Sequence, residues 1–191
     1  MIAVALLFRV GTRLSAPTRE SAQPAVHGTE AAVASEHSIA VLPFDNFSGD
    51  PAQAYFADGI TEDLITDLAR LPGLIVIARH SSFAYKGKQV IPQQVARELG
   101  VRYLLEGSVQ RQGDRLRINA QLIDALSGQH LWADRYGGTM NDVFAVQDKV
   151  IGEIVAALQL TLPDTTGRRE TSNPAAYDAL LQGLERLRQG S

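Results

Sequence analysis

The stretch SIAVLPFDNFSGDPAQAYFADGITEDLITDLARLPGLIVI, residues 38–77, contains the pattern that decides the fold. Ile39–Phe44 is continuously apolar, which is typical of a buried strand, and Leu74–Ile77 is a second such run. Between them, apolar residues recur at helical spacing; Asp50 precedes a proline and suits the helix start, and Gly73 suits its end. Because a strand, a helix and a strand joined in this way form a right-handed parallel unit, we expect the sheet to begin with parallel strands.

The chain then continues with polar and alternating segments that predict the rest of the sheet. A polar loop over Arg79–Lys88 leads to a short helix over Pro92–Leu99, which Gly100 ends. Three further strands follow, and tight turns join them. They cover Val101–Arg111, the alternating residues 116–122, and Gln129–Tyr136.

A long helix capped by Asn141 should cover this sheet, and its most apolar face carries Ile151 and Ile154. We therefore expect an α/β (α+β) fold. It is a two-layer domain whose mixed β-sheet has a parallel start and an antiparallel meander and is packed by amphipathic helices.

Composition excludes several classes of function. The chain has 18 Lys+Arg against 21 Asp+Glu, a net charge of −3, so it lacks the broad basic surface of a nucleic-acid-binding protein. With 45% hydrophobic residues it is an ordinary globular sequence. The absence of cysteine excludes disulfides, thiolate metal sites and cysteine nucleophiles.

The N-terminal residues 1–14 begin with the apolar run MIAVALLF, which is too short to cross a membrane alone. Two interpretations stay open: the end of a transmembrane helix that starts upstream, or an apolar segment that packs on the domain or stays loose. Residues 15–37 are rich in Ala, Ser, Pro, Thr and Glu and predict a flexible linker. The folded domain should span 38–162, followed by a linker over 163–172 and a helix over 173–191.

The last helix presents an apolar stripe, which is a candidate interaction surface. Its members are Tyr177, Leu180, Leu181, Leu184 and Leu187. Such a stripe packs back on the domain, pairs with another copy or stays in contact with water, and the last is unfavourable. The sequence favours self-association and packing back on the domain equally.

Motifs of common enzyme chemistry are missing from the sequence. We find no phosphate-cradling loop ending in Gly-Lys-Ser/Thr, no GxGxxG, no HExxH and no GxSxG. We therefore predict no catalytic, cofactor-binding or metal-binding residues, and no cofactor. Four carboxylates gather on the first long helix, and a solvated helix face explains them better than a bound cation or a basic partner does. They are Asp58, Glu62, Asp63 and Asp67.

One place favours a ligand more than any other. Ligands of open α/β sheets bind outside the carboxyl ends of parallel strands. The residues that follow the two predicted parallel strands are Asp45, Asn46, Arg79, Ser81 and Ser82. The arginine and the serine hydroxyls would suit an anion or a protein partner. The competing interpretation is that these five residues lie in turns, where their side chains hydrogen-bond to backbone groups. We favour this second interpretation.

Several long blocks resemble the TolB amino-terminal-like domain. They are SIAVLPFDNFSGDP, YFADGITEDLITDLARL, VIARHSSFAYKGK, the block from VARELG to DRYGG, and DVFAVQDKVIGEIVAAL. The resemblance covers 38–162 and implies a non-catalytic module. In bacterial proteins of this kind, an adenylate/guanylate cyclase or winged-helix domain and a transmembrane helix precede it. Residues 173–189 are similar to the first helix of a tetratricopeptide repeat, which normally follows.

The resemblance implies a binding or scaffold module of a membrane-anchored signalling protein. Its partners would be proteins, neighbouring domains or a second copy, without nucleic acid, and the membrane would be reached through an extended N-terminal segment. Arg9 and Arg13 favour the cytoplasm by the positive-inside rule. The resemblance favours the periplasm, and we follow it. The alternative is a fragment of a cyclase or of a winged-helix transcriptional regulator whose active domain lies upstream.

Overall fold

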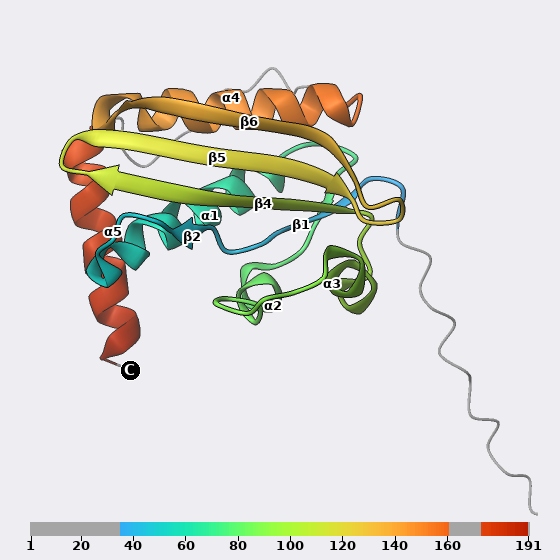
Figure 1. Cartoon of the computed structure of the whole chain (residues 1–191), viewed down its shortest axis with the longest axis horizontal. Helices are drawn as coiled ribbons and strands as arrows, with labels where there is room; N and C mark the ends of the chain where they lie inside the picture. The colour runs from blue at the N-terminus through green and yellow to red at the C-terminus, as the bar shows by residue number, and fades with distance from the viewer. Residues whose placement is uncertain (1–34, 161–172, 191) are drawn as a thin grey trace, which may run out of the picture. The chain divides into compact units, whose positions relative to one another are not determined.

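The strand that opens the folded region, β1 (Ser38–Val41), lies inside a mixed sheet with the order β3-β1-β4-β5-β6 (Figure 1). It pairs in parallel with β3 (Ile75–Val76) and with β4 (Tyr103–Gln112). β4, β5 (Arg115–Asp124) and β6 (Gln129–Thr139) then form an antiparallel meander. The α/β class and the mixed sheet, parallel at its start and antiparallel at its end, are confirmed.

The computed structural model describes residues 35–160 and 173–190. The predicted apolar segment 1–14, the linker 163–172 and most of the linker 15–37 lie outside the described residues. None of the described helices combines the length and the apolar character that a membrane crossing requires.

Helices α1 (Ala54–Leu68) and α4 (Val143–Ala157) cover one face of the sheet and share its main apolar core. Figure 1 shows α4 running alongside β6 and α1 behind β4. The core comes from the alternation of the strands: Ile39 and Val41 point to this face. Ala40 points to the opposite face.

A smaller apolar cluster covers one end of the opposite face, where α3 (Pro92–Leu99) packs. Val95 and Ala96 of this helix contact Leu104 of β4 and Ala40 of β1. The helix ends at Gly100, whose φ of 68° lies in the left-handed region, as the sequence predicts. Beyond α3, the opposite face of the meander carries polar side chains.

Helix α5 (Pro174–Gln189) packs against α1 and stands at the end of the sheet where β4 turns into β5 (Figure 1). Asn173 caps it, because its side chain accepts hydrogen bonds from the backbone N–H groups of Ala175 and Ala176. Leu181 lies so close to α1 that a Cβ at Gly59 would overlap it. The sequence left self-association and packing back on the domain equally favoured for this helix. The structure shows that it packs back on its own domain.

Three local features differ from the sequence prediction or add to it. The predicted loop over Arg79–Lys88 begins with a short helix, α2 (Arg79–Phe83), because the Arg79 guanidinium stacks on the Phe83 ring one turn later. Asp50 does cap, but it caps a 3₁₀ turn, Pro51–Gln53, that precedes α1. The short strand β2 (Asp45–Asn46) lies between that turn and β1 and pairs with β4.

The start and the apolar face of the long helix also differ from the prediction. Asn141 lies inside a 3₁₀ turn, Met140–Asp142, and the N-cap is Thr139. The Asp142 carboxylate completes a capping box by accepting the backbone N–H and the hydroxyl of Thr139. Ile154 is fully buried, but Ile151 is only partly buried at the rim of the core.

Candidate functional site

The residues predicted at the carboxyl ends of the parallel strands do not form one group. Asp45 and Asn46 form β2, while Arg79, Ser81 and Ser82 lie in α2. The Arg79 guanidinium already has partners, with its Nε 3.0 Å from Glu62 Oε2 and its centre 3.8 Å from the Phe83 ring. Ser82 is fully buried and Ser81 is exposed.

Of those five residues, only Asp45 lines the cavity of about 850 Å³ that lies on the polar face of the meander. The floor of this cavity comes from β4, β5 and β6. One wall comes from residues 42–47 and another from the segment Tyr85–Val90, which follows α2. Of the five residues predicted at the strand ends, one therefore reaches the cavity. The main surface of the cavity is the polar face of the sheet.

A cross-strand row of four polar residues runs through this floor. The strand register places Asp45 beside Ser108, Ser108 beside Asn119, and Asn119 beside Arg135. Asn119 Nδ2 donates to Ser108 Oγ over 2.8 Å, and Arg135 Nε donates to Asn119 Oδ1 over 3.0 Å. These bonds fix the orientation of the side chains, with a carboxylate at one end of the row and a guanidinium at the other.

A second row of residues lies next to the first on the floor, and it ends in a small side chain. It contains Glu106, Gln121 and Ala133. Gln121 Nε2 donates to Glu106 Oε2 over 3.2 Å, and Ala133 carries only a methyl group. Burial raises the pKa of Glu106, the hydrogen bond from Gln121 opposes this, and the nearby Asp45 charge adds to the rise. Ala133 leaves room above the sheet.

The carboxylates of α1 are not simply a solvated helix face, contrary to our expectation. Asp58 is buried and pairs with Lys86, while Glu62 pairs with Arg79 and with Arg188 of α5. Asp63 accepts hydrogen bonds from Tyr177 and Gln147. Within the described residues, no group of three His, Cys, Asp or Glu side chains could hold a metal ion.

The link between α5 and the rest of the domain is polar at its edge and apolar at its centre. Arg111, at the end of β4, forms a two-point ion pair with Asp178, with distances of 2.6 and 3.3 Å between nitrogen and oxygen atoms. Tyr55 of α1 also donates to Asp178. Between the helices, the Tyr177 ring packs edge-on against Phe144 and Phe56.

The apolar stripe predicted on α5 divides into two parts. Tyr177 and Leu181 are buried in the domain core. Leu180, Leu184 and Leu187 lie on the outer side and are 37%, 37% and 71% exposed.

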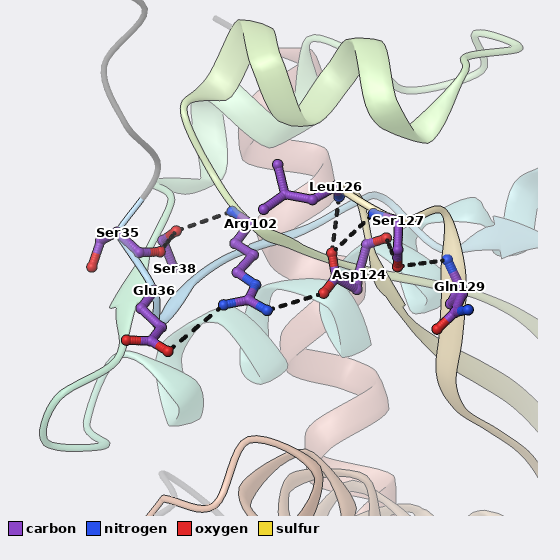
Figure 2. A network of polar contacts seen from close by, with 8 residues as sticks. All are labelled: Ser35, Glu36, Ser38, Arg102, Asp124, Leu126, Ser127 and Gln129. Atoms are coloured by element: carbon purple, nitrogen blue, oxygen red, sulfur yellow. Dashed lines mark hydrogen bonds and ion pairs between the residues drawn. The ribbon is translucent and has the colours of Figure 1, made fainter.

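A second polar network holds the start of the domain at the opposite end of β4 (Figure 2). The Arg102 guanidinium lies between Glu36 and Asp124, with nitrogen–oxygen distances of 3.8 and 3.3 Å. Its backbone N–H donates to Ser38 Oγ, and the Ser38 hydroxyl donates to the Ser35 carbonyl. The entering chain is thereby bonded to the sheet at several points.

Asp124 has a second role in the same network (Figure 2). Its Oδ1 accepts the backbone N–H groups of Leu126 and Ser127, and so fixes the turn from β5 into β6. One carboxylate therefore joins the turn to the arginine that holds the entering chain.

The sequence pattern did not reveal the floor of the cavity or either polar network. The alternation of Arg117, Asn119 and Gln121 indicated a polar face, but its neighbours on β4 and β6 depend on the strand register. The tight turn at Gly113 could have provided that register for β4 and β5. No local signal pairs Arg111 with Asp178.

Together, the mixed sheet, the helices on its core face, the anchored entering segment and the anchored helix α5 define a small α/β module without a recognisable enzyme motif. Residues 35–153, more than half of the chain, match the family model for the second domain of HilA/YgeH-like transcriptional regulators. The chain belongs to this family.

A curated relative extends far beyond this chain. It is a protein of Rhizobium meliloti (strain 1021) named "Putative adenylate cyclase 3", which is 59% identical over 158 residues. The match covers 80% of this chain but 27% of that protein. The chain therefore spans about a quarter of the length of this relative.

Solved structures with a related arrangement include TolB from Acinetobacter baumannii, with a TM-score of 0.46 and 20% identity over 63% of this chain and 28% of that chain. Lipoprotein GNA1162 from Neisseria meningitidis has a TM-score of 0.47 and 19% identity over 62% of this chain and 98% of its own. The LpoB C-terminal domain from Escherichia coli has a TM-score of 0.44 and 19% identity, covering 56% and 85%.

Proposed function

We propose that this chain is a non-catalytic binding and scaffold module of a membrane-anchored multidomain signalling protein, and that it works outside the cytoplasm. Its task is to hold the segment that enters it and the segment that leaves it in a fixed relation, so that neighbouring domains or protein partners act on one another through it. No step of this function requires a cofactor.

The observation that carries the proposal is the anchoring of the entering segment and of helix α5 at opposite ends of one strand. Arg102 immediately precedes β4 and bonds to the entering residues, whereas Arg111 lies near the end of β4 and bonds to α5. Nine residue steps of extended strand separate them by about 30 Å. A hydrogen-bonded strand is stiff, so a displacement at one end is passed to the other.

The comparisons support a place inside a longer protein. The family is described as the second domain of a transcriptional regulator, and the curated relative carries the name of an adenylate cyclase. Each supports one parent: a regulator whose DNA-binding domain lies upstream, or a cyclase whose catalytic domain lies upstream. In either, we infer that this module contributes no catalytic residue.

The anchoring to the inner membrane, the periplasmic location and a following tetratricopeptide repeat are further parts of the proposal. The domain boundaries at 38 and 162 belong to it as well. A repeat helix needs neighbours to cover its outer side. Leu180 and Leu184 on the outer side of α5 would then contact a following helix or a second copy.

A domain exchange tests the function. The matched region of the Rhizobium meliloti protein is replaced by this chain, by this chain with Arg111→Ala, or by a flexible Gly/Ser linker, and cyclic nucleotide formation is measured. We expect the first chimaera to keep the parent's activity and regulation, and the other two to lose regulation. Equal regulation in all three would contradict a scaffold role.

An assay of the isolated chain tests the non-catalytic part. Incubation with ATP or GTP and magnesium or manganese should give no cyclic nucleotide. Reproducible turnover that disappears on replacing Asp58 or Glu62 would overturn it. A fusion of alkaline phosphatase after the matched region of the relative tests the location, because this enzyme matures only outside the cytoplasm.

A further inference from the structure

The cavity on the polar face of the meander has no part in holding the chain ends. It lies on the face of the sheet away from the main core, and the residues of both anchoring networks are absent from its lining. At about 850 Å³ it falls in the size range, about 300–1,000 Å³, that small ligands occupy in proteins.

The floor has spare hydrogen-bonding capacity in fixed positions. An amide side chain offers two N–H donors and one oxygen acceptor, and a hydroxyl offers one donor. Within the described residues, Glu106 Oε1 and Gln121 Oε1 accept no hydrogen bond, and Ser108 accepts one from Asn119 without donating. The floor therefore offers both spare acceptors and a spare donor, which suits a ligand whose groups both donate and accept.

The walls add two aromatic rings to this polar floor. Phe47, which is 61% exposed, lies on one side, and Tyr85 lies on the other. The Tyr85 hydroxyl is held by Glu98 of α3, which keeps the ring in place. Flat rings beside a hydrogen-bonding floor match a ligand with alternating C–H and O–H surfaces.

The charges of the lining select against other ligand classes. Two carboxylates, Asp45 and Glu106, face two cations, Lys88 and Arg135, so the lining has no excess of positive charge that would hold a phosphate. The polar floor would leave its donors and acceptors unpaired beneath a lipid tail.

We propose that this cavity binds an uncharged polyhydroxylated ligand, an oligosaccharide of two or three rings, with Gln121, Glu106 and the Ser108–Asn119–Arg135 row bonding its hydroxyls. The site goes beyond the proposed scaffold function, which needs no ligand, so the two ideas can fail separately. Ala133 provides the space for a ring to approach the sheet.

Titration of the ¹⁵N-labelled chain with cellotriose, maltotriose or chitotriose tests the site by backbone amide shifts. We expect saturable shifts with at least one of them, confined to the cavity-lining residues of β4–β6 and the Tyr85–Val90 segment, with a dissociation constant of about 1 mM. No shift with any of the three trisaccharides would overturn the proposal. Stronger binding of trialanine or inorganic phosphate at the same amides would also overturn it.

Three variants localise the binding. Ala133→Leu fills the floor without removing a polar group, and Gln121→Ala removes one amide; each should weaken binding at least about tenfold. Arg117→Ala lies on the same face of β5 outside the cavity and should bind as the unmodified chain does. The amide spectrum verifies that each variant is folded. Because Ala133 is exposed, Ala133→Leu should fold and test the site even if Gln121→Ala does not fold. Undiminished binding by Ala133→Leu would contradict the site.

Discussion

Arg111 joins two elements that lie far apart in the sequence. Its guanidinium bonds to both oxygens of Asp178, stacks 5.2 Å from the centre of the Phe56 ring, and is only 19% exposed. Two parallel N–H···O bonds between partly buried side chains are stronger than an ion pair at the surface. This residue therefore contributes to the attachment of α5 in a way that an exposed arginine cannot.

Replacing Arg111 with alanine should lower the free energy of unfolding by about 1.5–3 kcal/mol, because Asp178 would stay half-buried without its partner. Chemical denaturation measures the loss. Arg117→Ala, an exposed arginine on the next strand, is the matched control and should change stability by less than about 0.5 kcal/mol. Similar losses in both variants would contradict a special role for the pair.

Asp178 should also make stability depend on pH. Burial opposes ionisation, but the hydrogen bonds from Arg111 and Tyr55 prevail and lower the pKa of Asp178 in the folded state. The native state then binds this proton more weakly than the unfolded state does. The stabilisation is therefore present above the unfolded pKa, about 3.9, and is lost as the pH falls through the folded value.

The comparison with Asp178→Asn tests this sign. The unmodified chain should be more stable than the variant at pH 6, and the difference should shrink steadily below about pH 4. Denaturation curves at several pH values measure it. Asp63, whose pKa burial raises, is the same in both chains and cancels from the difference. A difference that is constant down to pH 2 would show that Asp178 is not held in its charged form.

At the scale of elements, periodicity predicted the type and order of nearly every segment. The run around β1, the alternation in β5 and the apolar faces of α1 and α4 each reflect burial on one or two sides, which the local sequence records. The run Leu74–Ile77 was wrongly predicted as a buried strand, because β3 covers only Ile75–Val76 at the edge of the sheet and Ile75 is 54% exposed. The errors fall where a tertiary contact decides. α2 forms where Arg79 stacks on Phe83, and Ile151 is only partly buried although it lies on the predicted apolar face of α4.

The site was predicted less well because it depends on register. Asp45 was among the predicted ligand residues, but its row partners come from three strands that no single window of sequence relates. The polar attachments of α1 and α5 join residues more than a hundred positions apart, such as Tyr55 and Asp178. Only the fold brings them together.

Ile154 and Ile151 of α4 give a matched pair for the core. Ile154→Ala should cost about 2–5 kcal/mol because the side chain is fully buried between α4 and the sheet. Ile151→Ala should cost clearly less, about 1 kcal/mol, because its side chain is only partly buried. Chemical denaturation of both variants measures the difference. Equal losses would mean that α4 packs with a different face on the sheet.

For α5, the two parts of the stripe should respond differently. Leu181→Lys places a charge against Gly59 and the core and should destabilise the domain by several kcal/mol, about 3 or more. Leu180→Lys lies on the outer side and should leave the melting temperature nearly unchanged. Thermal melts followed by circular dichroism distinguish them. If Leu181→Lys leaves the melting temperature unchanged, the helix is not part of the core.

At the scale of the whole molecule, the strand β4 lies between the two polar attachments. Its start is bonded to the entering residues through Arg102, and its end to α5 through Arg111. The cavity lies on the polar face between these two attachments, over Glu106 and Ser108. A ligand there would contact the same strand that joins the two ends.

The central claim is that α5 and the entering segment belong to one cooperative unit with the sheet. Native-state hydrogen exchange tests it most directly, because it measures the free energy at which each segment opens. We expect the amides of α5, β1 and β4 to exchange at closely similar opening free energies, near that of global unfolding, and Arg111→Ala to lower the value for α5 first. Exchange of α5 amides at the rate of a free helix, while β4 stays protected, would contradict the account.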